Sequence, residues 1–315
     1  MGAKQGTWVV VLAGGQGRRL VPLTRALYGS DLPKQFAVLS GDRSLLQQTV
    51  ARAVQLAPAE RVLVVVAAEH RALARQQLGA WRGIELVVQP RNLDTGPGIL
   101  LPVARIRGRA PRARVTILPA DHHFADDRPL LAVLRAAWRG GSRRRVTLVG
   151  VQPDRDETEY GWIVRGRRIQ AAGPTAFWVS RFHEKPGPLV AGMLRARGAL
   201  WNTFISTGPV SAFWRLARLH LPVHARHLDE YARHLGSAGE AAALAEAYAR
   251  MPPASFSHDL LAFAAGLAVV PLAHSGWSDW GSPTRVLESL AGTPDHARLL
   301  ACISAARAAP PLAAG

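Results

Sequence analysis

The sequence predicts an α/β protein built on a doubly wound sheet that is mostly parallel and becomes mixed in its second half. Short runs of β-branched residues alternate with segments of helical periodicity along the first half of the chain. These runs are apolar throughout, as strands buried on both faces are. Hydrophobic residues make up 48% of the 315 residues and charged residues 19%, so the chain can bury a large core.

The regular alternation occupies the first half of the chain. Its β-branched runs predict the strands 7–12, 61–67, 84–88, 115–118 and 146–151. The segments between them have apolar residues at helical spacing and predict the helices 44–56, 69–81, 98–107 and 129–139. Alternation of this kind is typical of a parallel sheet with helices on both faces.

The pattern changes after Gly150, where a mixed sheet is expected. Strands are predicted at 160–164, 177–182 and 267–272, and helices at 187–197, 209–220, 240–251 and 283–290. From Ala291 the sequence is rich in Ala and Pro. We therefore expect one domain over residues 1–290 and a short helical C-terminal tail over 291–315.

Charge and cysteine content restrict the choice of partners. The formal charge is +17, but the basic residues are scattered, and only Lys4, Lys34 and Lys185 among 39 of them are lysine. A dispersed arginine bias does not predict a nucleic-acid partner. One cysteine, Cys302, excludes an internal disulfide, and no apolar run reaches membrane-spanning length. These features favour a cytoplasmic protein without a membrane partner.

The stretch VVVLAGGQGRRLVPLTR, residues 9–25, carries the first functional signal. Gly14, Gly15 and Gly17 follow the first predicted strand and allow backbone N–H groups to surround an anion. Leu20 stands where a dinucleotide fingerprint needs its third glycine, and no Lys-Ser or Lys-Thr pair completes a P-loop. Pro22 is expected to prevent an easy helix here. From these residues alone, a glycine turn without a ligand remains the alternative.

Charged residues follow other predicted strands. Ligands of open parallel sheets bind over the carboxyl ends of the strands. Asp121 follows strand 115–118 and Asp279 follows strand 267–272. Taken alone, Asp121 also fits a helix N-cap and Asp279 an ordinary turn, so both interpretations stay open at this point.

Taken together, the motifs resemble a known family. LAGGQGRRL, DLPKQF, ILPADHH, RFHEKP, LWNTF and GWSDWG occur in this order. They resemble the nucleotidyltransferases that couple a sugar 1-phosphate to a nucleoside triphosphate, most closely the mannose-1-phosphate guanylyltransferases, from about Val9 to Leu290. The resemblance implies a Rossmann-like nucleotidyltransferase fold with residues 1–290 as the catalytic domain. It also implies GTP and mannose 1-phosphate as substrates, Mg²⁺ as cofactor, and GDP-mannose and pyrophosphate as products, and it is compatible with a homo-oligomer.

The resemblance also assigns roles to individual residues. The implied catalytic residues are Arg19, Lys34, Asp121 and Lys185. The implied nucleotide-binding residues are Leu12, Ala13, Gly14, Gly15, Gln16, Gly17, Arg18, Thr95 and Pro97. The implied sugar-phosphate-binding residues are Gly161, Glu184, Lys185 and Asn202. Asp121 and Asp279 fall on the metal positions, which suits Mg²⁺ because it takes few carboxylates together with phosphate oxygens and water.

Some positions depart from the family pattern. Arg18 stands where Thr is usual, Asp94 where a small residue is usual, and Thr203-Phe204 where Ser-Gly is common. These departures leave open the same chemistry with another sugar 1-phosphate and nucleotide, or a non-catalytic sugar-nucleotide-binding regulatory protein.

The histidines do not predict a metal site. His122 and His123 are adjacent, so they cannot both point into one site, and we expect solvent or indirect contacts for them. His220, His224 and His227 are expected in a helical surface region without supporting carboxylates or cysteines.

Overall fold

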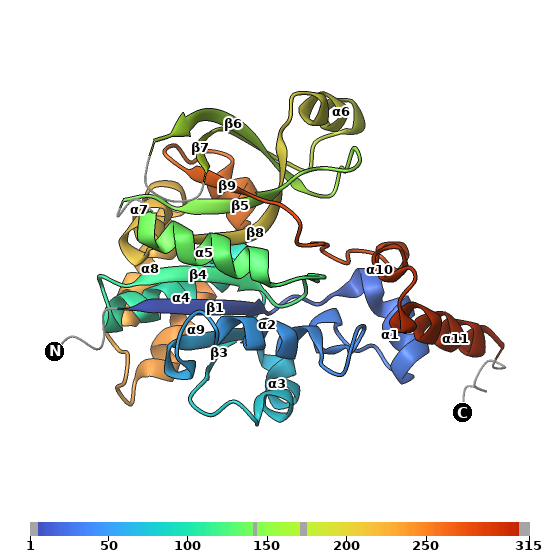
Figure 1. Ribbon diagram of the computed structural model, residues 1–315. Coiled ribbons are helices and arrows are strands. Elements are labelled where there is room, and N and C mark those ends of the chain that lie inside the picture. Colours follow the sequence, from blue (N-terminus) through green and yellow to red (C-terminus); the bar gives the residue numbers. More distant parts are fainter. Residues whose placement is uncertain (1–5, 141–143, 171–174, 309–315) are drawn as a thin grey trace.

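A nine-stranded sheet forms the centre of the computed structural model, which describes residues 6–140, 144–170 and 175–308 (Figure 1). The strands are β1 (Thr7–Ala13), β2 (Val62–Ala67), β3 (Glu85–Gln89), β4 (Arg114–Pro119), β5 (Thr147–Val151), β6 (Gly161–Ile169), β7 (Ala176–Glu184), β8 (Leu200–Pro209) and β9 (Ala268–Leu272). Their order is β3-β2-β1-β4-β8-β5-β9-β7-β6, with a further pairing of β8 and β6.

The sheet is doubly wound and mixed, as predicted. Strands β3, β2, β1 and β4 are parallel, and β5 is parallel to β9. Strand β8 lies antiparallel between β4 and β5, and β6 and β7 form an antiparallel hairpin at the far edge. The carboxyl ends of β1 and β4 therefore meet at one edge of the parallel half.

Strand β8 was missed by the sequence analysis, which predicted no strand over 200–209. Its middle is polar, yet it is buried on both faces. Thr203 donates its hydroxyl to the carbonyl of Val149 at 2.7 Å, and the hydroxyls of Thr207 and Thr116 lie 2.8 Å apart. Because hydrogen bonds satisfy these side chains inside the sheet, the strand does not need the apolar run by which the others were found.

The described part of the chain contains eleven α-helices. They are α1 (Val21–Tyr28), α2 (Leu45–Ala53), α3 (Arg71–Leu78), α4 (Thr95–Arg109), α5 (Arg128–Gly140), α6 (Pro188–Ala196), α7 (Val210–His220), α8 (Pro222–Ala232), α9 (Glu240–Arg250), α10 (Pro283–Leu290) and α11 (Pro294–Ala308). Within residues 6–140, 144–170 and 175–308, none of the helices has the length and hydropathy needed to cross a membrane.

Two expectations about helices were wrong. Pro22 does not prevent a helix: it lies in the first turn of α1, where a missing N–H removes no intrahelical hydrogen bond. The helical assignment around His224 and His227 is correct, but these residues are buried, with 3% and 6% exposure. Helix α8 packs against α7 and α9, and these two helices help to bury its histidines.

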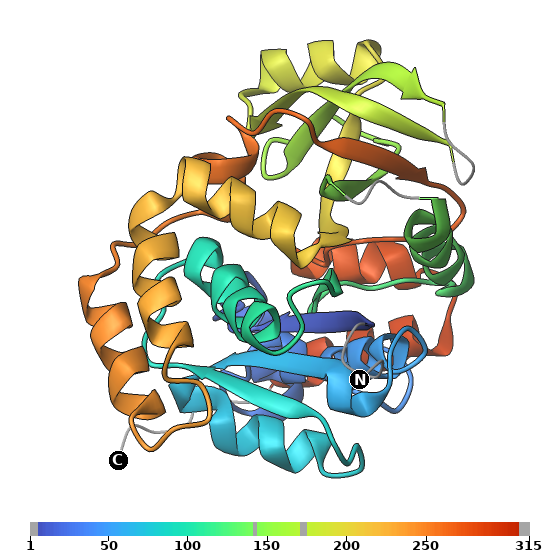
Figure 2. The ribbon, with the colours of Figure 1, turned by 90° about the vertical axis from the view of Figure 1, so that its left-hand side faces the viewer.

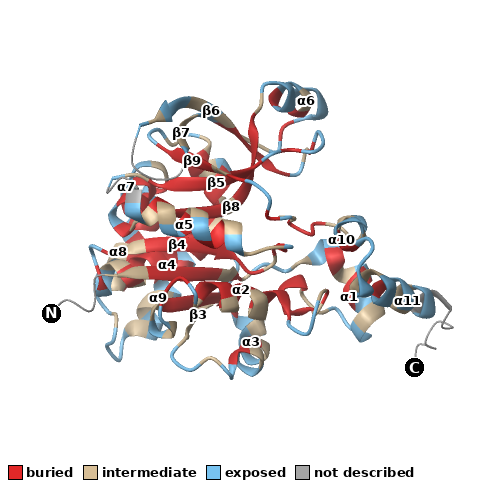
Figure 3. Cartoon of the chain, in the orientation of Figure 1, coloured by how far each residue is buried: buried red, intermediate tan, exposed pale blue. Residues whose placement is uncertain are grey.

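Helices cover both faces of the sheet, and Figure 2 shows the two layers from the side. One core contains Val10 together with residues of α4, α7, α8 and α9. The other contains Val9 and Val11 together with residues of α2, α3, α5 and α6. Successive residues of β1 thus enter opposite cores, as the twofold repeat of a strand requires. The buried residues are concentrated in the strands between the layers (Figure 3).

A third, smaller core lies beyond the carboxyl end of β1. It joins α1, α10 and α11 through Leu20, Trp280, Val286 and Leu299. The predicted helical tail is therefore present as α11, which packs against α1. Residues 309–315 of the predicted tail lie outside the described residues, and the division at residue 290 stays a prediction.

Candidate active site

A cleft of about 1040 Å³ opens at the carboxyl ends of β1 and β4. It is lined by the glycine loop after β1, the β3–α4 connection, the end of β4, the β6–β7 hairpin, and the segments around Ser257 and Trp277. Ligand pockets in proteins commonly measure about 300–1,000 Å³. The volume of this cleft is therefore at the upper end of the usual range.

The glycine loop is held in place by a glutamine that the sequence analysis did not assign. The Gln35 side chain donates to the carbonyl of Ala13 at 3.0 Å and to that of Gly15 at 2.7 Å. At Gly17, which has a φ of 59°, a Cβ would lie 2.8 Å from the backbone nitrogen of Lys34. Fixing the loop through its carbonyls is compatible with presenting its N–H groups to a phosphate.

The predicted nucleotide-binding residues lie at different depths around this loop. Those that line the cleft are Leu12, Gly14, Gly15, Gly17 and Thr95. Ala13 and Pro97 are buried and do not line it, and Gln16 and Arg18 lie outside the lining. Thr95 opens α4, and its hydroxyl accepts the N–H of Phe256 at 2.9 Å. This bond fixes the segment around Phe256 against the start of α4.

Lys34 connects the two predicted metal positions. Its buried ammonium lies 3.0 Å from Oδ2 of Asp121 and donates to the backbone carbonyl of Asp279. Burial by itself would raise the pKa of Asp121, but the charge of Lys34 and its hydrogen bond help to hold this pKa below its ordinary value. Asp121 is therefore an ionised carboxylate beside the segment that carries Asp279.

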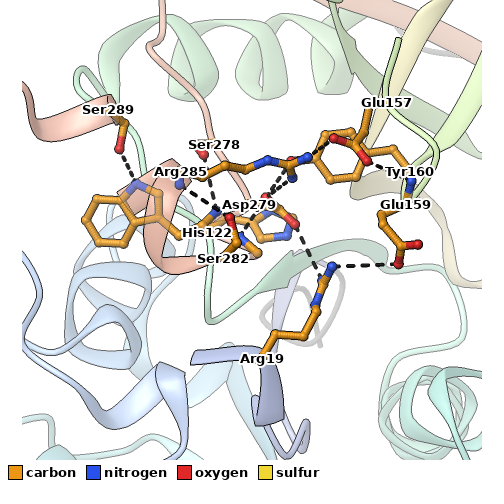
Figure 4. A network of polar contacts seen from close by, with 12 residues as sticks. Arg19, His122, Glu157, Glu159, Tyr160, Ser278, Asp279, Ser282, Arg285 and Ser289 are labelled. Carbon is orange, nitrogen blue, oxygen red and sulfur yellow. Dashed lines mark hydrogen bonds and ion pairs between the residues drawn. The ribbon is translucent and has the colours of Figure 1, made fainter. Parts of the chain in front are cut away.

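Asp279 belongs to a network of polar contacts (Figure 4). Its Oδ1 accepts from the N–H of Gly281 at 2.8 Å, from Arg285 at 2.9 Å and from the hydroxyl of Tyr160. Its Oδ2 lies 3.7 Å from the guanidinium of Arg19. Neither Tyr160 nor Arg285 was predicted as a functional residue. The segment SPTR directly after GWSDWG was the available signal for Arg285.

The adjacent histidines are buried, so of the two expected kinds of contact, solvent or indirect, the solvent contact was wrong. His122 lines the cleft, and its Nδ1 accepts from the indole of Trp277 at 3.2 Å. His123 stacks on Trp280 with ring centroids 4.1 Å apart. Burial lowers the pKa of both to about 4, so both are neutral near pH 7. The prediction that they would not share one site agrees with these separate partners.

The β6–β7 hairpin contributes the opposite side of the cleft. Lys185 and Arg19 both approach the Glu159 carboxylate, at 3.7 and 3.8 Å. Two cations from distant segments thus flank a single anionic group. Glu184 lines the same side, and its Oε2 is buried without a hydrogen-bond partner among the described residues. Burial raises the pKa of Glu184, because its carboxylate is partly removed from water and its Oε2 has no donor to replace the water.

The positions that depart from the family pattern differ in their surroundings. Asp94 and Phe204 line the cleft, whereas Thr203 is fully buried behind it. Asn202, a predicted sugar-contacting residue, also lines the cleft, and its side-chain oxygen accepts the N–H of Phe204 at 3.2 Å. The φ angles of Asp94 and Phe204 are 69° and 60°, and those of Lys185 and Trp280 are both 45°. Residues other than glycine rarely adopt this left-handed backbone region.

Asp121 and Asp279 can bind a hard divalent cation only if other ligands complete its coordination shell. No group of three or more His, Cys, Asp or Glu residues is arranged to hold a metal ion within the described ranges. Asp121 and Asp279 each keep one carboxylate oxygen without a hydrogen bond of normal length. Mg²⁺ accepts such a site, because it usually binds one or two carboxylates and completes its shell with water and phosphate oxygens.

Comparisons with known proteins agree with these features. The model of a family described as nucleotidyl transferase matches residues 8–293. The mannose-1-phosphate guanylyltransferase of Escherichia coli (strain K12) is 30% identical over 313 residues, which cover 93% of this chain and 62% of that protein. The enzyme of the same name, ManC, from Salmonella typhimurium is 30% identical over 293 residues, covering 91% and 60%. The chain thus spans about three fifths of the length of these curated relatives.

A solved structure is similar over most of the chain. The crystal structure of a protein named mannose-1-phosphate geranyltransferase, from Thermus thermophilus, matches with a TM-score of 0.78 and 31% sequence identity. The match covers 91% of this chain and 80% of that one. The family match over residues 8–293 contains every cleft-lining residue.

Proposed function

Since this chain belongs to the nucleotidyl transferase family, we propose that it transfers a guanylyl group from GTP to mannose 1-phosphate, giving GDP-mannose and pyrophosphate. The main support is the arrangement around Lys34, which joins Asp121 to the Asp279 segment in the cleft that also contains the glycine loop and Lys185. The names of the relatives support the choice of sugar and base.

In this proposal the two phosphate groups enter from opposite sides of the cleft. The glycine loop and Arg19 bind the triphosphate, and Lys185 binds the phosphate of mannose 1-phosphate. The contacts of Arg19 and Lys185 with Glu159 support this arrangement, because both cations already reach one anionic group. The main barrier to the reaction is the alignment of two mutually repelling anions, the triphosphate and the sugar phosphate. Positioning and charge neutralisation therefore supply most of the catalysis.

The carboxylates and polar side chains have distinct roles. Asp121 and Asp279 would hold Mg²⁺, which supplies charge neutralisation at the α-phosphate when bound. Lys34 keeps the Asp121 carboxylate ionised and holds it beside the backbone of Asp279. Glu184 and Asn202 accept and orient sugar hydroxyls. Attack by a phosphate oxygen does not require a general base, so the neutral His122 acts as a packing and hydrogen-bonding partner of Trp277.

Replacement of Lys185 by Arg should impair the sugar-phosphate side of the reaction. We expect kcat/KM for mannose 1-phosphate to fall about 10- to 100-fold, because a planar guanidinium on a longer stem displaces the acceptor phosphate. The KM for GTP should change less than about twofold. Steady-state kinetics with each substrate varied measure both values. The exchange Arg181→Lys on the exposed face of the same hairpin is the control, and normal kinetics of Lys185→Arg would contradict the assigned role.

The substitution Gly161→Ala should weaken sugar binding through Glu184. A Cβ at this position would lie 2.8 Å from Oε2 of Glu184 and 2.7 Å from the ring of Phe182, so the carboxylate must move. We expect the KM for mannose 1-phosphate to rise about tenfold, a loss of roughly 1.4 kcal/mol in binding. In the control Gly166→Ala, on the same strand, the nearest atom lies 3.3 Å away. Equal kinetics of the two variants would remove Glu184 from the sugar site.

Pyrophosphate release tests the proposed function. The purified protein is assayed with Mg²⁺ across a grid of sugar 1-phosphates and nucleoside triphosphates. Release with mannose 1-phosphate and GTP is expected. Release only with another pair would keep the chemistry and replace the substrates, with Asp94 and Phe204 in the cleft as the first residues to examine. No release with any pair, despite ligand binding by calorimetry, would favour a non-catalytic regulatory protein.

A further inference from the structure

Arg285 is the only arginine in Figure 4 that contacts both Asp279 and a second buried carboxylate. It lies in the first turn of α10, where the side chain of Ser282 caps its N–H at 3.3 Å. Its guanidinium pairs with Glu157, donates to Oδ1 of Asp279 at 2.9 Å, and stands 4.7 Å above the ring of Tyr160. The side chain is only 16% exposed.

The contacts of Arg285 determine which carboxylate oxygen of Asp279 is available. Oδ1 accepts from Gly281, Tyr160 and Arg285, so its lone pairs are already engaged by protein donors. Oδ2 has only the longer contact to Arg19, at 3.7 Å, among the described residues. A carboxylate held by three donors on one oxygen cannot rotate freely, so the other oxygen keeps a fixed direction in the cleft.

The charge of Arg285 is compensated within the network. Because Glu157 forms its own ion pair with this guanidinium, Asp279 does not have to neutralise Arg285 alone. Burial lowers the pKa of Arg285, yet a guanidinium stays protonated in proteins. Asp279 therefore shares a cation with Glu157 and retains negative charge for a further partner.

We propose that Arg285 is a positioning residue, which orients the Asp279 carboxylate so that Oδ2 remains free for the divalent cation. This inference rests on the proposed function, because it assumes that Asp279 binds metal. Arg285 contacts neither substrate nor metal in this proposal. It acts through Asp279, and Glu157 keeps the guanidinium in place and balances its charge.

A purely structural role is the competing explanation. Arg285 joins the segment 157–160 to α10, and a buried pair that loses one partner destabilises a protein strongly. Replacement of both partners by neutral residues of similar size is often tolerated. The double variant Glu157→Gln/Arg285→Met therefore separates the two roles, because it removes the contact with Asp279 without leaving Glu157 as an unpaired buried charge.

The experiment compares Arg285→Met, the double variant and a matched control. Arg155→Met is the control, since Arg155 also reaches α10, at Glu288 (3.2 Å), but is about half exposed and pairs with Asp154 and Glu288 instead of Asp279. Two quantities are measured: the Mg²⁺ concentration that gives half-maximal pyrophosphate release, and binding of Mn²⁺ alone, followed by electron paramagnetic resonance. The resonance measurement does not depend on turnover.

In Arg285→Met and in the double variant we expect the half-maximal Mg²⁺ concentration and the dissociation constant of Mn²⁺ each to increase about tenfold or more, with no change in Arg155→Met. Wild-type values of both quantities in the double variant would overturn the proposal, because the pair would then act only on stability. Wild-type protein that binds Mn²⁺ but releases no pyrophosphate would refute the proposed function, and weaker Mn²⁺ binding in the variants would still support the role of Arg285. Absence of Mn²⁺ binding in the wild type would overturn the positioning role.

Discussion

Asp279→Asn should reduce kcat for pyrophosphate release by about three orders of magnitude, an increase in the activation barrier of roughly 4 kcal/mol. The amide oxygen can still accept from Gly281 and Tyr160, so the network around Oδ1 is largely preserved. The other oxygen becomes an NH₂ group that cannot bind Mg²⁺ and faces Arg19. The loss should therefore appear in turnover, with only a small change in the midpoint of thermal unfolding.

The control for this variant is Asp154→Asn, a carboxylate that is 66% exposed and paired with Arg155. It should keep wild-type kinetics. Increasing Mg²⁺ should not restore Asp279→Asn, because the missing ligand is lost at any metal concentration. Activity of Asp279→Asn within about tenfold of the wild type would remove this residue from the metal site.

The second large effect is expected for Lys34→Met. Methionine fills a similar volume but removes the ammonium that lies 3.0 Å from Asp121 and bonds to the carbonyl of Asp279. We expect kcat/KM for GTP to fall about a thousandfold, because Asp121 loses its cation and the segment of Asp279 loses the hydrogen bond that holds it beside Asp121. The pKa of Asp121 should return toward its ordinary value at the same time.

Stability measurements distinguish this loss from unfolding. Removing one partner of a buried charged hydrogen bond should lower the free energy of unfolding by about 1–3 kcal/mol, which leaves a protein of this size folded. Arg25→Met in α1, which removes an exposed ion pair with Asp31, should change neither activity nor stability appreciably. Lys34→Met with normal turnover would show that the carboxylates do not depend on this cation.

The sequence predicts the fold where apolar runs and helical periodicity coincide with burial. The parallel strands β1 to β4 are visible for that reason. Strand β8 is not, because its buried Thr203 and Thr207 satisfy their hydroxyls inside the sheet. The helix at Pro22 was missed because a proline signals a break only beyond the first turn.

The cleft residues could be predicted only where a motif marks them. The glycine loop, Lys34, Lys185 and the two aspartates stand in recognisable short motifs. Arg285 follows the motif of Asp279 by a few residues but its role is not marked, and Tyr160 meets Asp279 only through the fold, because it is 119 residues away from it in sequence. Such partners are defined by tertiary contacts, which one sequence does not reveal.

The left-handed residues around the cleft have a consequence for engineering. Asp94, Lys185, Phe204 and Trp280 each keep a side chain where the backbone favours glycine, at a cost of about 1–2 kcal/mol per residue. A mutant library selected only for heat resistance should therefore accumulate glycine at the exposed positions Asp94 and Lys185, whereas the packing of Phe204 and Trp280 should retain these two side chains. Asp94 and Lys185 both line the cleft, so the most thermostable clones would be poor catalysts, and selection must score heat resistance and turnover together.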